Sequence, residues 1–96
     1  NYQKTVLAAF GQVADALQAI RNETAEVQAQ REALRTAADS ADIARKSFAA
    51  GNIGIIQVLD AERQRAQAQL ALTRAQGQLL GNVVRLYLAL GGGVEK

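Results

Sequence analysis

Cysteine and histidine are both absent from this chain of 96 residues. Without them the chain cannot form a disulfide, use a thiol nucleophile, build a histidine metal site or carry out histidine acid–base catalysis. Proline is absent as well, which suits long uninterrupted helices. Aromatic residues make up only 4% of the chain, so few large side chains are available to fill a thick globular core.

Charge of one sign and long apolar runs are also scarce. The eleven basic and nine acidic residues are interspersed and leave a net charge of +2, so no basic face for nucleic acid is expected. The most apolar stretch, residues 79–90, contains Asn82 and Arg85 and is too short to cross a membrane. No signal peptide pattern is present, and the chain opens at Asn1 directly in a helical pattern, which we interpret as a piece of a larger protein.

The sequence also lacks the residue patterns of catalysis. It has no recognisable nucleophile–base pair and no metal-binding cluster. The stretches "GNIG" and "GGG" lack the strand–turn–helix context that a phosphate-binding loop needs. We therefore predict a protein that is not an enzyme and that uses no cofactor.

What the first half of the chain does contain is a helical pattern of apolar residues. The pattern alternates spacings of four and three over about six heptads, which is typical of a coiled-coil seam. It predicts a helix over about residues 2–49, about 70 Å long at a rise of ~1.5 Å per residue. Ten of the thirteen seam residues are apolar, and the full set is Val6, Phe10, Val13, Leu17, Ile20, Thr24, Val27, Arg31, Leu34, Ala38, Ala41, Arg45 and Phe48.

The stretch "AAGNIG" interrupts this pattern once. Gly51 is suited to the left-handed conformation that commonly ends a helix, and Asn52 and Gly54 extend the turn. The sequence therefore predicts a turn at residues 50–54 and a second helix over about residues 55–90. The expected fold class is all-α, a long antiparallel helical hairpin of coiled-coil type.

The second helix carries two apolar stripes, and a helix with two stripes usually has neighbours on two sides. The first stripe is Ile56, Leu59, Ala66, Leu70, Leu80, Val84 and Tyr87, completed by Arg63, Thr73 and Gly77. The second stripe is Ala68, Leu72, Ala75, Leu79, Val83, Leu86 and Leu90. We expect the hairpin to oligomerise or to pack on another part of its own protein, and the isolated chain to dimerise as a four-helix bundle.

The two predicted arms differ in length by about a dozen residues, or about 18 Å of helix. The longer first arm would therefore extend beyond the second. Val6, Phe10 and Val13 lie on this overhang and are expected to be uncovered by the second arm.

Three stretches carry a family resemblance over nearly the whole chain. They are "AFGQVADAL" at residues 9–17, "SFAAGNIGIIQVLDAERQRAQAQLALTRAQ" at residues 47–76 and "VVRLYLALGGG" at residues 83–93. The chain resembles the C-terminal region of TolC-like outer-membrane efflux proteins, which share an aromatic residue and a glycine at the turn, an apolar pair, "LDA" with a basic residue soon after, and a final "LY.ALGGG".

The resemblance implies a fold and a cellular role. Members of this family are trimers that form a tunnel from the periplasm through the outer membrane, with a β-barrel in the membrane and a helical barrel in the periplasm. Residues 1–96 would form the last hairpin of that helical barrel, as a fragment located in the periplasm. The implied function is export of small molecules or ions, and the implied partners are a periplasmic adaptor and an inner-membrane pump.

The resemblance also implies roles for residues near the turn. Asp60 matches a pore-lining acid, and a ring of three carboxylates would attract cations at a narrow gate. Ile56 matches an apolar pore-narrowing position, and Arg63 matches a basic position that links protomers in some members. Gln57 stands at the pore-lining position where some members carry a second acid. The adaptor would contact the tip at a set of four residues: Ser47, Phe48, Gly51 and Asn52.

Simpler interpretations stay open at this point. Asp60 fits a first-turn acid that favours the helix dipole, or a partner for Arg63 three residues later on a solvated face. The pairs Asp42/Lys46 and Glu62/Arg65 fit routine surface ion pairs, and Arg45 has no assigned role. The alternative function is a stand-alone coiled-coil interaction module, such as an adaptor hairpin or a four-helix-bundle dimer.

Overall fold

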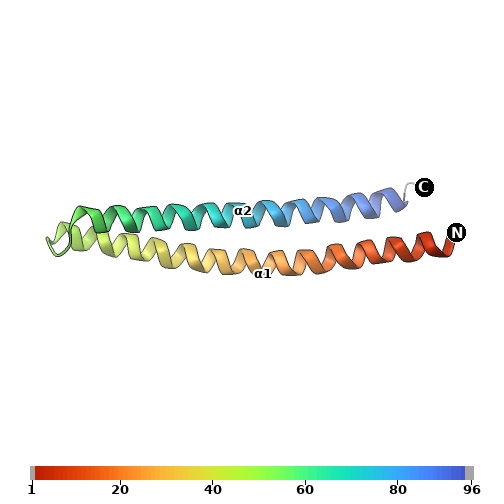
Figure 1. The fold of residues 1–96 in the computed structure, drawn as a ribbon, viewed down its shortest axis with the longest axis horizontal. Coiled ribbons are helices and arrows are strands. Elements are labelled where there is room, and N and C mark those ends of the chain that lie inside the picture. Colours follow the sequence, from red (N-terminus) through yellow and green to blue (C-terminus); the bar gives the residue numbers. More distant parts are fainter. Residues whose placement is uncertain (1, 95–96) are drawn as a thin grey trace.

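The chain folds as two long helices joined by a short turn (Figure 1). The computed structural model describes the backbone of residues 2–94 and the side chains of residues 3–8 and 10–91. Helix α1 spans Tyr2–Ala49 and helix α2 spans Ile55–Val94. The two helices run antiparallel, and their extents of 73 × 17 × 14 Å agree with the length expected from the sequence. The predicted all-α hairpin is confirmed.

The end of α2 differs from the prediction. The helix continues through residues 91–93 to Val94 instead of ending near residue 90. Glycine in a helix costs about 1 kcal/mol relative to alanine but does not forbid helical geometry, and no proline interrupts this segment. The arms therefore differ by eight residues, 48 against 40. Of the residues expected on the overhang, Phe10 is 69% exposed, whereas Val6 and Val13 are partly buried, so the prediction was wrong for these two.

The α1 seam was half correct. Alternate members of the predicted seam, which lie seven residues apart in the sequence, face α2. They are Val13, Ile20, Val27, Leu34 and Ala41. The residues between them are mostly exposed, namely Phe10, Leu17, Thr24, Arg31 and Arg45. The positions that alternate with the inward set are instead Ala16, Glu23, Gln30, Ala37 and Ala44, which are partly buried. Alanine and polar residues gave no apolar signal there, so the sequence favoured the wrong neighbouring face.

The core is thin. Val27, Leu72 and Ala75 form a buried cluster, with Leu34 and Leu79 packed against it. Near the turn, Ala41 and Val58 are the other buried apolar residues of the described chain. A two-helix hairpin can enclose little area, so most of its stabilisation comes from one seam along its length.

The two stripes predicted on α2 have different surroundings. The second stripe faces α1, since Ala68, Leu72, Ala75, Leu79, Val83 and Leu86 are buried or partly buried, while Leu90 is 47% exposed. All ten positions of the first stripe, which we call the outer stripe, are exposed. One of the two neighbours expected for α2 is therefore α1, and the second surface is open to solvent in the single chain.

Candidate functional site at the hairpin tip

The turn is closed by backbone hydrogen bonds from three residues. The Gly51 N–H donates to the Phe48 carbonyl at 2.9 Å, and the Asn52 N–H donates to the Ser47 carbonyl at 2.9 Å. The Ala50 N–H donates to the Lys46 carbonyl at 3.0 Å. Together with φ of 81° at Gly51, these bonds form a Schellman motif with Gly51 in the left-handed position.

The four residues expected at the tip therefore lie together in the turn, and each has a structural part in it. Gly51 supplies the left-handed backbone, while Ser47, Phe48 and Asn52 supply the hydrogen-bonding groups. Phe48 also leaves 43% of its surface exposed beside the turn. The backbone of the tip is thus held by hydrogen bonds, and one aromatic ring is available for contact.

Gln57 caps the start of α2. Its side-chain Oε1 accepts a hydrogen bond from the Gly54 N–H at 3.3 Å, and its own N–H donates to the Gly54 carbonyl at 3.2 Å. This is one half of a capping box, in which the third helical residue reaches back to the N-cap backbone. The Gln57 side chain therefore points back toward Gly54. The sequence did not reveal the cap, because the usual Ser or Thr of the motif is a glycine here.

Asp60 forms its polar contacts within its own helix. Its Oδ1 lies 2.6 Å from Arg63 Nη2, and its Oδ2 accepts a hydrogen bond from Gln64 Nε2 at 3.0 Å. The side chains of Asp60 and Arg63 are 48% and 69% exposed. The pairing three residues apart, expected from the sequence as the simpler interpretation, is confirmed. An exposed pair of this kind stabilises a helix by about 0.2–1 kcal/mol.

Ile56, Asp60 and Arg63 share one face of the first turns of α2, because they are spaced by four and three residues. Ile56 is 73% exposed, and Leu59, one turn from it, is 57% exposed. The end of the outer stripe nearest the turn therefore presents two large aliphatic side chains next to an ion pair. This surface is suited to packing against other helices while keeping a charged group at its edge.

One contact joins the two arms near the tip and was missed by sequence reasoning. Arg45 Nε of α1 lies 3.3 Å from Glu62 Oε1 of α2, and Glu62 Oε2 lies 3.8 Å from Arg65 Nη1. Glu62 Oε1 is buried and accepts no hydrogen bond within the described chain, so its contact with Arg45 is one of charge. The charged seam residue Arg45 was the available signal, but its partner depends on the register between the arms.

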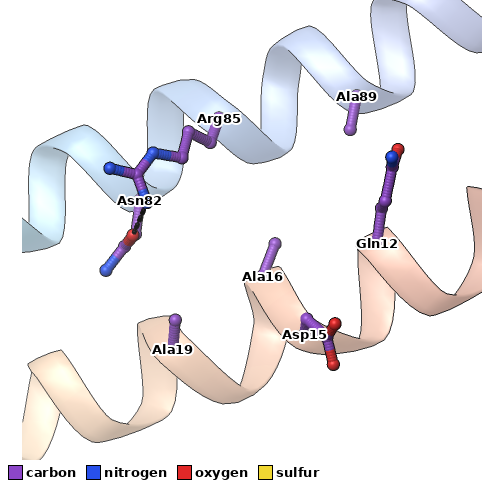
Figure 2. A pocket seen from close by; sticks show the side chains of 7 residues that line it. All are labelled: Gln12, Asp15, Ala16, Ala19, Asn82, Arg85 and Ala89. Carbon is purple, nitrogen blue, oxygen red and sulfur yellow. Dashed lines mark hydrogen bonds between the residues drawn. The ribbon is translucent and has the colours of Figure 1, made fainter.

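A groove lies between the arms toward their open end (Figure 2). It has a volume of about 440 Å³ and is lined by Gln12, Asp15, Ala16, Ala19, Asn82, Arg85 and Ala89. Arg85 Nη1 donates a hydrogen bond to Asn82 Oδ1 at 3.3 Å, and both side chains are seen on the α2 side of the groove. Alanine side chains leave this part of the interface underfilled.

A second groove, of about 570 Å³, shares Asn82 and Arg85 with the first and adds Glu23 and Arg74. Gly77 and Gly81 also line it, and a Cβ atom at either would meet nothing within 4 Å, so neither glycine serves a close approach of the arms. Both grooves are mixed in charge. Among the described residues, no group of three or more acidic side chains is placed to hold a metal ion.

The described helices contain no segment that is both long enough and apolar enough to cross a membrane.

Ion pairs are concentrated in the tip half of the hairpin, where Asp42 and Lys46 form the predicted pair at 3.1 Å. On α1, the hydrogen bond and positive charge of Arg35 hold the pKa of Glu32 below its ordinary value. Both members of that pair are largely exposed.

Fold and tip together define a long antiparallel helical hairpin with a capped turn and an uncovered stripe on its second helix. The chain belongs to the outer membrane efflux protein family, which matches it over residues 1–92. It is 36% identical over 93 residues to the probable efflux pump outer membrane protein TtgC of Pseudomonas putida, covering 97% of this chain and 19% of that protein.

Two further relatives have the same extent of similarity. Nodulation protein T of Rhizobium leguminosarum bv. viciae is 33% identical over 93 residues, covering 97% of this chain and 19% of that protein. The cation efflux system protein CusC of Escherichia coli K12 is 32% identical over 93 residues, covering 97% of this chain and 20% of that protein. The chain thus spans about a fifth of the length of these relatives. No solved structure matched it.

Proposed function

We propose that this chain is the hairpin of the periplasmic helical barrel of an outer-membrane efflux duct, which exports small molecules or ions. The observation that carries the proposal is the family match over residues 1–92, which runs through both arms and the turn. Relatives named as efflux pump outer membrane proteins and as a cation efflux system protein support the same class. In the full-length protein, three copies would assemble, with an adaptor and an inner-membrane pump as partners.

In this arrangement the outer stripe of α2 packs against a neighbouring helix of the barrel beyond Arg63, while its first residues lie at the tip. Its ten exposed positions run from Ile56 to Tyr87, about 46 Å along the helix. A surface of this length would be costly to leave in water, since burial of apolar area contributes about 25 cal/mol per Å². The alternative function, a stand-alone coiled-coil module, uses the same surface, but it does not explain the family match.

The gate would form where three copies of the tip meet. Ile56 would narrow the opening, and Asp60 would place a carboxylate at its edge. Arg63 would hold Asp60 in position within each copy, because the two groups are 2.6 Å apart in the single hairpin. Gln57 has a different part, since its side chain caps α2 at Gly54. Phe48 and the turn residues Ser47, Gly51 and Asn52 would form the contact surface for the adaptor.

The proposal is tested by cross-linking at the tip. A full-length protein whose only cysteine is introduced by Ile56→Cys should form disulfide-linked pairs of protomers under mild oxidation, and export should fall and recover on reduction. The control is Leu7→Cys, near the open end of α1 at a residue that is 70% exposed and lies far along the hairpin from the proposed gate. Cross-linking at both positions alike, or at neither, would argue against convergence of the tips.

A further inference from the structure

The outer stripe of α2 and the charges around it specify how a second copy of this chain would bind. We infer that the isolated chain forms a two-fold dimer in which both tips lie at the same end and α1 of each copy packs beside the outer stripe of its partner's α2. This inference concerns the 96-residue chain by itself and does not depend on the proposed duct. The exposed apolar area identifies the surface that binds, and the distribution of charge identifies how the two copies are oriented.

The apolar area is sufficient for a dimer. Six large residues of the outer stripe are each about half to three-quarters exposed: Ile56, Leu59, Leu70, Leu80, Val84 and Tyr87. At roughly 100–150 Å² of exposed area each, they offer about 700 Å² per copy, and two copies reach the range of roughly 1,200–2,000 Å² that stable interfaces bury. None of these six lines either mixed-charge groove, so the stripe is the more apolar surface for association.

Leu17 and Phe10 of α1 extend the apolar surface near the open end. They are 47% and 69% exposed. Because the arms meet at Ala49 and Ile55, residues of the two arms lie level when their numbers add up to about 104. Leu17 is therefore about level with Tyr87, and the large exposed residues of the two arms would meet if α1 of one copy lay beside α2 of the other with the tips together.

The charges of the two helices have opposite balance over this length. Residues 63–91 of α2 contain four arginines and no acidic residue. The level segment of α1, residues 13–41, contains five acidic and three basic residues. The ion pairs of the described chain all lie between residues 32 and 65, so Asp15, Glu23 and Arg74 of the open half have no ion pair in the single chain.

This imbalance selects one orientation. When two hairpins stack face to face, a two-fold axis parallel to them places the acid-rich α1 beside the partner's arginine-only α2, twice, with opposite charges facing each other. A two-fold axis perpendicular to the hairpin places α2 beside the partner's α2, which brings arginines together without an acid to offset them. Complementary charge favours the correct partner and orientation more than it adds affinity, so the apolar stripe drives association and the charges choose its geometry.

The first test is the association state by sedimentation equilibrium. The chain should be a dimer, and Leu70→Gln with Leu80→Gln should weaken it by about tenfold per leucine. Glutamine is a good helix former, so circular dichroism should show the helices intact. Ile43→Gln, at an exposed α1 residue that is off the seven-residue spacing of Phe10 and Leu17, is the control and should leave the dimer unchanged. A monomer at all concentrations, or a double variant as dimeric as the unmodified chain, would overturn the inference.

The second test measures orientation. Because the chain has no cysteine, Asn52→Cys gives one spin-label site per copy at the tip. Tips at the same end predict a label–label distance of roughly 20–40 Å, since neighbouring helices pack about 8–10 Å apart. A distance close to the 73 Å length of the hairpin would mean that the tips lie at opposite ends and would overturn the proposed orientation.

Discussion

Gly51 decides where the hairpin turns. Its φ of 81° lies in the left-handed region, which costs a residue with a Cβ atom about 1–2 kcal/mol. A Cβ atom there would meet nothing within 4 Å, so the strain would be purely one of backbone conformation. Gly51→Ala should therefore lower the free energy of unfolding by about 1–2 kcal/mol, measured by thermal or urea unfolding followed by circular dichroism.

Gly77→Ala is the matched control for that prediction. Gly77 is in the interior of α2 with ordinary helical φ and open space around its Cα atom. Alanine is about 1 kcal/mol more favourable than glycine in a helix, so this variant should be more stable than the unmodified chain. If both substitutions moved stability in the same direction, Gly51 would not have the role assigned to it.

Glu32 offers a residue-scale test of the surface electrostatics. The hydrogen bond and charge of Arg35 lower its pKa in the folded chain. A lowered folded-state pKa means that the stabilising interaction is present above the ordinary pKa of glutamate and is lost as the pH falls through the lowered value. Carboxyl titration by NMR should give Glu32 a pKa below the ordinary one, and Arg35→Gln should return it. An unchanged pKa in that variant would show that the pair does not persist in solution.

At the tip, the sequence predicted the left-handed glycine from its residue type and the Asp60–Arg63 pair from its spacing of three residues. Both signals are local in the sequence. The cap formed by Gln57 was missed because its N-cap residue is Gly54, which has no side chain to signal a motif. The Arg45–Glu62 contact was missed for a different reason. A contact between arms requires the register of the hairpin, and a shift of one or two residues changes which side chains meet.

At the scale of the element, the sequence predicted both helices and the turn but placed the seam of α1 only in part. The sequence predicted both apolar stripes of α2, and the structure shows that the second of them faces α1. On α1 the inward face alternates large apolar residues with alanine, glutamate and glutamine, while Phe10 and Leu17 stand on an exposed face. A hairpin whose outward surface also carries apolar residues offers two similar patterns, and only the position of the other helix separates them.

Leu72 and Leu70 test the assignment of the two stripes. They have the same side chain in the same helix, but Leu72 is 7% exposed and Leu70 is 51% exposed. Leu72→Ala removes buried contacts with α1 and should cost about 2–4 kcal/mol of folding free energy. Leu70→Ala should cost less than about 1 kcal/mol in the single hairpin, where its side chain is half in water. Unfolding should be followed in dilute protein, and equal losses would contradict the assignment.

At the scale of the whole molecule, the hairpin is a narrow rod with one seam, a capped tip and an uncovered stripe. Its 73 Å length sets how far the tip stands from the open end (Figure 1). A single rod of this kind buries too little area to be very stable on its own. The chain spans about a fifth of the length of its relatives. The uncovered stripe is the surface through which it would join a larger assembly, whether a barrel or a dimer.

The most direct test of a duct with Asp60 at its gate is the ion selectivity of the full-length protein in a planar bilayer. Asp60→Asn should reduce its preference for cations, because a ring of carboxylates at the constriction would become neutral. Glu32→Gln, on the exposed surface of α1, removes the same charge elsewhere and should leave selectivity unchanged. Unchanged selectivity in Asp60→Asn would place Asp60 outside the gate, and a full-length protein that forms no channel would contradict the duct itself.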